Sequence, residues 1–141
     1  MKLDRLADPR PLPPWTKLAL VLEVLAVYAR AWLLLRRRDV RTALALLRAS
    51  RGDGYGRIQT YTGAARLGQI VSRVLASTPA RSRCLMISVV LSTMLARRGV
   101  DSSIVIGVRS GSPFGAHAWA ELEGHPLTPA GDSEFERLVT L

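Results

Sequence analysis

The sequence has one cysteine and two histidines in 141 residues, and this scarcity excludes several kinds of site. A single cysteine, Cys84, cannot form a disulfide within the chain. One thiol with two distant imidazoles also cannot supply a cysteine-rich zinc site. We therefore expect no metal and no cofactor. Without disulfides, the cytoplasm, a reducing compartment, is the simplest expectation.

Acidic and aromatic residues are also few. Eleven Asp and Glu stand against twenty Lys and Arg, a net charge of +9, and aromatic residues make up only 6% of the chain. Such a surface attracts nucleic acid, acidic lipid or acidic peptide, although a genome that favours arginine codons gives the same excess. Nucleic-acid-binding proteins usually interleave basic and aromatic residues on one face. Because the arginines here lie on the flanks of expected helices, we expect no nucleic-acid partner.

One long apolar run, residues 17–35, has the length of a membrane span. It contains Lys17, Glu23 and Arg30, and each charge near the centre of a bilayer costs roughly 2.5–3.5 kcal/mol to insert. It lacks a small-residue cleavage site and follows three prolines, so we do not expect it to be a signal peptide. We expect a buried or interfacial helix, with a peripheral membrane contact through this helix and the arginines at 36–38 as one possible role.

The remaining pattern fits one domain, residues 1–141. Apolar spacing predicts four helices, at 16–37 (capped by Thr16), 40–49 (capped by Asp39), 62–76 and 83–98. In the second helix Leu44 and Leu47 are expected to face inward, with Arg41 and Arg48 outside. The glycine-rich stretch 51–56 is interpreted as a loop, since a dinucleotide-binding fingerprint needs a preceding strand.

After the fourth predicted helix the sequence pattern changes from that of helices to that of strands. Strands are predicted at 103–108, 117–122 and 125–128, with Glu123-Gly124 as a two-residue hairpin turn. Residues 133–141 are expected to form a short helix or a strand. Helices followed by an antiparallel sheet indicate an α+β fold, with a helical part at 1–79 and a catalytic helix and sheet at 80–141.

Cys84 lies at the start of the last predicted helix, which is apolar in its middle. A lone cysteine in such surroundings is usually a small buried hydrophobic residue. Here, however, the free N–H groups and positive dipole end of the helix favour a thiolate, and Arg81 and Arg83 act in the same direction. The same N–H groups would stabilise the oxyanion formed when the thiol attacks a carbonyl.

His117 is the candidate base for this thiol. A histidine at the start of a strand is more often structural than catalytic, but the helix of Cys84 is expected to pack on the sheet that contains His117. Thiol activation requires a base within hydrogen-bond reach and a third group that orients the imidazole. His125 follows the hairpin turn directly and is expected to be exposed, which makes it a weaker candidate.

Several segments together carry a family resemblance. Arg83-Cys84-Leu85 opens an apolar helix that ends in Leu-Ala-Arg-Arg-Gly99, and the strand Ile-Val-Ile-Gly-Val-Arg109 precedes Pro113-Phe-Gly-Ala-His-Ala-Trp-Ala-Glu121. In this combination the chain resembles the lasso-peptide leader peptidases, which belong to the transglutaminase-like superfamily and have a papain-like fold. The resemblance is strong over about residues 80–141 and loose over the helical first half.

This resemblance implies that Cys84 is the nucleophile and His117 the general base, with Trp119 packed beside them. Residues 107–109 and 113–114 would flank the cleft. The implied activity is removal of the leader from a ribosomally made precursor peptide, before a separate synthetase closes the macrolactam. The implied partners are the precursor's leader, that synthetase and a separate small leader-recognition protein, since the chain has the length of the family's stand-alone form.

The third catalytic residue departs from the family pattern. The family often has an acidic residue about twelve positions after the histidine, where this chain has Pro129. With a two-residue turn, His117 faces Ala130, and Asp132 lies diagonally at roughly 7–8 Å, which makes it the best carboxylate. Glu121 shares the face of His117 but lies about 13 Å along the strand. An enzyme without a carboxylate is the third alternative.

Two other functions use the same residues. A peptide-binding module of this fold without catalysis would fit the missing family carboxylate. A transglutaminase-like enzyme would use the same thiol and imidazole but would pass the acyl group to an amine instead of water. The family resemblance favours hydrolysis.

Overall fold

The computed structural model describes residues 9–49, 58–79, 83–111, 115–129 and 135–141. Its helices are α1 (Pro14–Arg37), α2 (Val40–Ala49), α3 (Tyr61–Val74), the 3-10 turn η1 (Leu75–Ser77) and α4 (Arg83–Arg97). Its strands are β1 (Ser103–Arg109), β2 (Gly115–Leu122), β3 (His125–Pro126) and β4 (Glu136–Thr140). The α+β architecture and the four predicted helices are confirmed.

The helix starts follow from local capping chemistry. Asp39 caps α2 as predicted, since its carboxylate accepts hydrogen bonds from the backbone N–H of Thr42 at 3.2 Å and from its hydroxyl at 2.6 Å. These bonds hold the pKa of Asp39 below its ordinary value. The predicted start of α1 was wrong by three residues: the N-cap is Pro13 instead of Thr16 and the helix begins at Pro14, because proline is favoured in the first helical turn.

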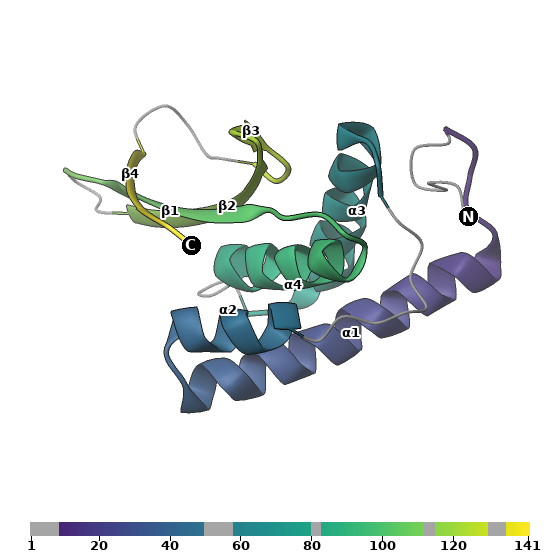
Figure 1. Cartoon of the computed structure of the whole chain (residues 1–141), viewed down its shortest axis with the longest axis horizontal. Helices are drawn as coiled ribbons and strands as arrows, with labels where there is room; N and C mark the ends of the chain where they lie inside the picture. The colour runs from purple at the N-terminus through teal and green to yellow at the C-terminus, as the bar shows by residue number, and fades with distance from the viewer. Residues whose placement is uncertain (1–8, 50–57, 80–82, 112–114, 130–134) are drawn as a thin grey trace.

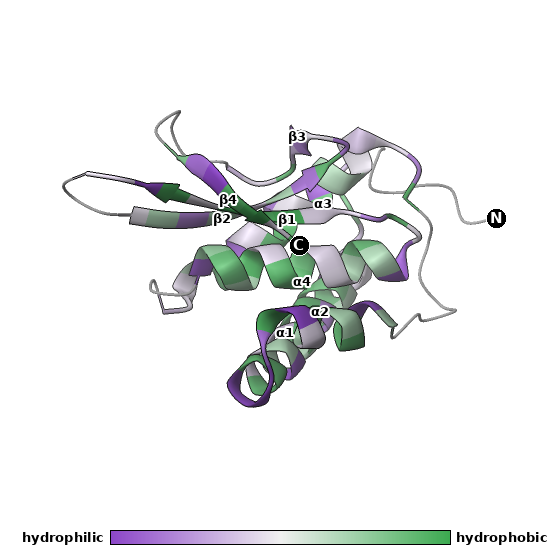
Figure 2. Cartoon of the chain, turned by 60° about the vertical axis from the view of Figure 1, so that its left-hand side comes forward, coloured by the Kyte–Doolittle hydropathy of each residue, from purple (hydrophilic) through white to green (hydrophobic). Residues whose placement is uncertain are grey.

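Helix α4 lies at the centre of the molecule, between the sheet on one side and α1 and α2 on the other (Figure 1). Hydrophobic residues occupy most of its length (Figure 2), and all residues from Ser88 to Leu95 are buried. One apolar cluster joins α4 to α1, α3 and β2, and a second joins it to α1, α2 and β1. Each fully buried Val or Leu stabilises the fold by about 1.5–3 kcal/mol, so α4 is the main packing element.

The sheet is antiparallel, with strand order β3-β2-β1-β4. Leu122 pairs with His125 as predicted, and Glu123 and Gly124 have φ values of 51° and 82°, the left-handed pair that a type I′ turn requires. Strand β3 is shorter than predicted, because the hydroxyl of Thr128 takes the place of a backbone acceptor for Ala120 N–H at 3.0 Å. The C-terminal segment forms a strand, not a helix.

The predicted exposure of α2 was wrong at one position. Leu44 and Leu47 are buried and Arg41 is exposed, as expected, but Arg48 is half-buried. Its guanidinium donates to Ser92 Oγ at 3.1 and 2.7 Å and to the carbonyl oxygen of Ser102 at 3.1 Å. Arg48 therefore ties α2 to α4 and to the segment that enters β1.

Candidate active site

Cys84 is the second residue of α4, so the predicted position at a helix N-terminus is confirmed. Its side chain is partly accessible and forms no disulfide. The guanidinium of the neighbouring Arg83 donates to the carbonyl oxygen of Thr78 at 3.1 and 2.6 Å, which joins the start of α4 to the end of η1. Arg81 lies outside the described residues. The first N–H groups of α4 have no partner within the helix, and this end can bind a developing negative charge.

His117 lies on β2, which begins at Gly115, two residues before the predicted start. It is paired with Gly107 of β1 and is half-buried. The imidazole is stacked near Trp119, with ring centres 6.0 Å apart and planes at 25°, and its centre lies 5.6 Å from that of Phe135. Two aromatic rings therefore limit the orientations that the imidazole can adopt.

A backbone carbonyl fixes the protonation pattern of His117. Its Nε2 lies 2.7 Å from the carbonyl oxygen of Pro129. A carbonyl can only accept a hydrogen bond, so Nε2 must carry the proton and, in the neutral ring, the lone pair is on Nδ1. Within the described residues Nδ1 makes no hydrogen bond. His117 is thus held in the tautomer whose Nδ1 can act as a base.

Pro129 takes the place expected of an acidic residue. It lies twelve positions after His117, where the family resemblance leads one to expect a carboxylate, and it supplies a main-chain oxygen in its place. Asp132, the carboxylate predicted from register, lies outside the described residues. The role of Pro129 escaped the sequence analysis because any residue has a carbonyl group.

Glu121, the alternative carboxylate, serves Trp119 and not His117. Its Oε1 accepts from the indole Nε1 of Trp119 at 2.8 Å and from Arg137 of β4 at 2.6 Å. The Glu121 side chain is only 5% exposed, so the ion pair and the indole satisfy a buried charge. Glu121 therefore holds the ring that packs beside His117.

The glycine at 107 makes room for that ring. A Cβ atom on Gly107 would lie 2.8 and 2.9 Å from two carbons of the Trp119 indole and 3.2 Å from the carbonyl oxygen of Glu136. The indole therefore crosses β1 where that strand has no side chain. The family resemblance predicted residues 107–109 beside the cleft, but no pattern in the sequence indicates this close approach.

Arg109 adds a positive charge to the same face of the sheet. It pairs with Gly115, two residue pairs beyond that of Gly107 and His117, and its guanidinium lies 5.3 Å from the ring centre of Phe135. The Phe135 ring thus lies near both the guanidinium of Arg109 and the imidazole of His117. The expected flanking residues 113–114 lie outside the described residues.

The structure places Cys84 and His117 on adjacent elements, because α4 packs against β2 more extensively than against any other strand. In the part of the chain that the structure describes, no hydrogen bond joins the thiol to the imidazole. Such bonds are often long in free enzymes and shorten when substrate binds. The catalytic pair thus stays a prediction, with Nε2 of His117 on the carbonyl of Pro129 and Cys84 at a helix N-terminus.

His125 is at the other end of β2. It pairs with Leu122, five residues from His117, or about 16 Å at about 3.3 Å per residue. A cavity of about 690 Å³ lies at this end, lined in part by Tyr61, Asp101, Glu123 and His125. Among the described residues no cluster of His, Cys, Asp and Glu could hold a metal ion. His125 and the cavity are therefore remote from His117.

Comparison with known families gives a match that covers most of the chain. A family described as the transglutaminase-like superfamily matches residues 24–140, which include both Cys84 and His117. No curated protein and no solved structure gives a significant match.

Proposed function

Because the chain belongs to the transglutaminase-like superfamily, whose members are typically cysteine-dependent enzymes, we propose that it is a cysteine peptidase that removes the leader from a lasso-peptide precursor. The observation that carries the peptidase chemistry is the fixed tautomer of His117, with Nε2 on the carbonyl of Pro129 and Nδ1 left as a base. The proposal of a lasso-peptide precursor as substrate is supported by the motifs around Cys84 and His117, which resemble those of the leader peptidases.

The first half of the proposed mechanism forms an acyl-enzyme. His117 Nδ1 takes the proton of the Cys84 thiol, and the thiolate attacks the carbonyl carbon of the last leader residue. The N–H groups at the start of α4 stabilise the oxyanion. When the intermediate collapses, the C–N bond breaks and the imidazolium gives its proton to the departing amine of the core peptide. The leader is then held as a thioester.

The second half releases the leader. His117 takes a proton from water, the resulting hydroxide attacks the thioester, and the C–S bond breaks. The proton returns to the Cys84 sulfur, so the enzyme is regenerated and the leader leaves as a carboxylic acid. The carbonyl of Pro129 stabilises the imidazolium in both steps through its partial negative charge, which is less than a carboxylate would provide.

The proposed partners follow from the substrate. A leader peptide would be presented by a small recognition protein, and the freed core amine would be used by the macrolactam synthetase. Both partners are supported by the family resemblance of residues 80–141. The half-buried position of Cys84 is compatible with a substrate that enters as an extended peptide.

Cleavage of a synthetic precursor in ¹⁸O-labelled water tests the proposal, with the leader-recognition protein present. Hydrolysis of a thioester predicts a leader acid that carries one ¹⁸O from the solvent. Cys84→Ala should abolish cleavage and keep the fold, whereas His125→Ala, a histidine remote from the site, should cleave normally. Persistent cleavage by Cys84→Ala excludes the mechanism.

The two alternative functions give different products in the same assay. A transglutaminase-like enzyme would release the leader as an amide of an added primary amine, without ¹⁸O. A binding module would give no product and would still bind the precursor. Of the three, hydrolysis is favoured because the motifs around Cys84 and His117 resemble those of the leader peptidases.

A further inference from the structure

Helix α1 has two apolar faces. The inward face consists of Leu20, Val24, Val27 and Ala31, all buried against the rest of the fold. A second set is exposed, with exposed fractions in parentheses: Trp15 (71%), Leu18 (60%), Leu22 (58%), Leu25 (47%) and Trp32 (44%). We call this second set the outer stripe. At about 100° per residue the mean directions of the two sets differ by about 160°.

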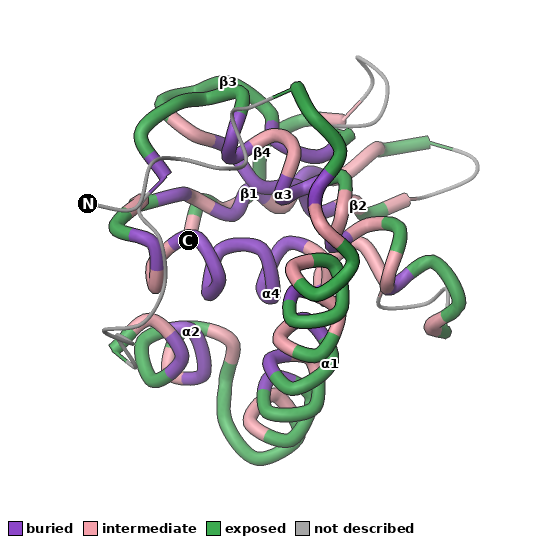
Figure 3. The backbone as a smooth tube through the Cα atoms, turned by 90° about the vertical axis from the view of Figure 1, so that its right-hand side faces the viewer, coloured by how far each residue is buried: buried purple, intermediate pink, exposed green. Residues whose placement is uncertain are grey.

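The outer stripe lies on the side of α1 that faces away from the core. Figure 3 shows α1 exposed along one side and buried along the other, where it packs toward α4. Single exposed leucines are common on protein surfaces, but a continuous apolar stripe that follows one helix for five turns marks an interaction site.

The charges on α1 are of one sign on its exposed side. Glu23 is the helix's sole carboxylate, and its side chain is only 9% exposed. Arg98, the residue directly after α4, donates to both of its oxygens, at 2.9 and 2.6 Å. The exposed charged residues of α1 and its C-cap are cations: Lys17, Arg30, Arg36, Arg37 and Arg38. The outward side of α1 is thus apolar and cationic, without a compensating acid.

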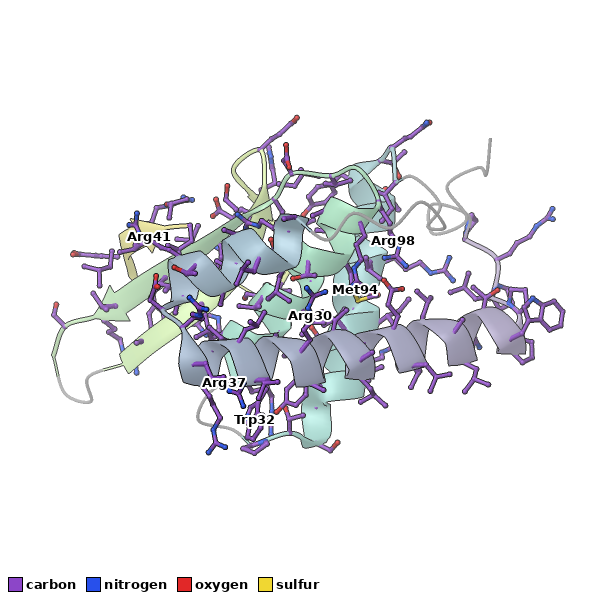
Figure 4. All side chains as sticks on the ribbon, turned by 60° about the horizontal axis from the view of Figure 1, so that its bottom comes forward. Arg30, Trp32, Arg37, Arg41, Met94 and Arg98 are labelled. Atoms are coloured by element: carbon purple, nitrogen blue, oxygen red, sulfur yellow. The ribbon has the colours of Figure 1, made fainter. Side chains whose placement is uncertain are left out.

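Tryptophan and arginine meet at the C-terminal half of the helix. Arg36 lies over the ring of Trp32, 4.2 Å from its centre. Figure 4 shows Trp32 and Arg37 projecting from the edge of α1 opposite α2. Tryptophan prefers the boundary between water and hydrocarbon, and arginine binds phosphate there.

We propose that the outer stripe docks α1 onto the surface of an anionic lipid bilayer, with the helix lying in the plane of the interface. The leucines would enter the acyl boundary, while the arginines contact lipid phosphates. This proposal is independent of the peptidase chemistry.

Two other arrangements fit the observations less well. By length and composition α1 is able to cross a membrane, but crossing would remove its inward face from the core. The 3–4 spacing of the outer stripe also suits a helical protein partner. A helix that binds another helix usually has charged residues of both signs beside its apolar stripe, whereas the exposed charged residues of α1 are all cations.

Vesicle sedimentation of the full chain tests the proposal. Binding to vesicles of phosphatidylcholine with phosphatidylglycerol should exceed binding to phosphatidylcholine alone by roughly tenfold or more, and should weaken with salt. The triple variant Leu18→Gln, Leu22→Gln, Leu25→Gln should lose this binding. Leu138→Gln, which changes a leucine of β4 that is 64% exposed, should bind like the unaltered chain.

The charge contribution is tested by Arg36→Gln, Arg37→Gln, Arg38→Gln, which should lose the preference for anionic vesicles. Circular dichroism checks that each variant is folded. Equal binding by the leucine triple variant, or no binding of the unaltered chain to anionic vesicles, would overturn the proposal. A third outcome would also overturn it: the unaltered chain self-associates and does not bind vesicles, and the leucine triple variant abolishes the self-association. The outer stripe would then be a contact between copies of the chain.

Discussion

The Nε2 atom of His117 lies 2.7 Å from the carbonyl oxygen of Pro129, so a main-chain atom orients the candidate base. A carbonyl at this position has two consequences. It sets the tautomer as well as a carboxylate does, and it does not depend on the side chain at position 129. Substitutions at 129 and at 132 therefore distinguish the two candidate orienting groups.

If the Pro129 carbonyl orients His117, Asp132→Asn should lower kcat/KM for precursor cleavage by less than about tenfold. Loss of an orienting carboxylate in a triad costs about 10⁴ in kcat. Pro129→Ala keeps the carbonyl and should retain most activity. A loss of a thousandfold or more in Asp132→Asn would instead make Asp132 the orienting residue.

Gly107→Ala should destabilise the fold by about 1–3 kcal/mol, because the new methyl group meets the Trp119 indole and the carbonyl of Glu136. Urea denaturation measures this change. The control is the same substitution in a Trp119→Phe background, where the smaller ring removes most of the overlap. An equal cost in both backgrounds would show that the indole is not what requires glycine at 107.

Arg48→Met should lower the free energy of unfolding by about 1–3 kcal/mol, since Ser92 Oγ and the Ser102 carbonyl lose the hydrogen bonds that Arg48 donates in a half-buried place. Arg41→Met, on the exposed side of the same helix, should change it by less than about 0.5 kcal/mol. Thermal and urea denaturation measure both changes. If Arg48→Met and Arg41→Met lowered the free energy of unfolding equally, the contacts of Arg48 would contribute no stability.

The cap of α2 should make a pH-dependent contribution. Hydrogen bonds from Thr42 lower the pKa of Asp39 in the folded chain from its ordinary value of 3.8. A lowered folded pKa means that the stabilisation is complete above the unfolded value and is lost as pH falls through the folded one. Asp39→Ala should therefore be slightly less stable than the unaltered chain at pH 7. The difference should shrink at pH 3, and a constant difference would contradict the role of the charge.

Local patterns in the sequence predicted most of the fold. Apolar spacing located all four helices, Asp39 marked the start of α2, and Glu123-Gly124 predicted a hairpin whose positive φ values the structure confirms. Each of these signals acts between residues close together in the chain. The start of α1 was missed because proline and threonine both begin helices.

The rest depends on contacts between distant segments. Arg48 looked like a solvated residue on a helix flank, but its acceptor Ser92 is 44 positions away. Glycine is required at position 107 because the Trp119 indole on the neighbouring strand approaches it closely. The oxygen that orients His117 is a backbone carbonyl, which every residue has, so no residue type marks it in the sequence. Positions 107 and 117 were identified from motifs, while their physical roles required the register of the sheet.

The most direct measurement for the pair of Cys84 and His117 is the rate at which iodoacetamide alkylates Cys84 near neutral pH, compared between the unaltered chain and His117→Gln. A thiol activated by this imidazole reacts as a thiolate, so His117→Gln should slow alkylation by about tenfold or more. His125→Gln should leave the rate unchanged. Equal rates in the unaltered chain and His117→Gln would contradict a catalytic pair of Cys84 and His117.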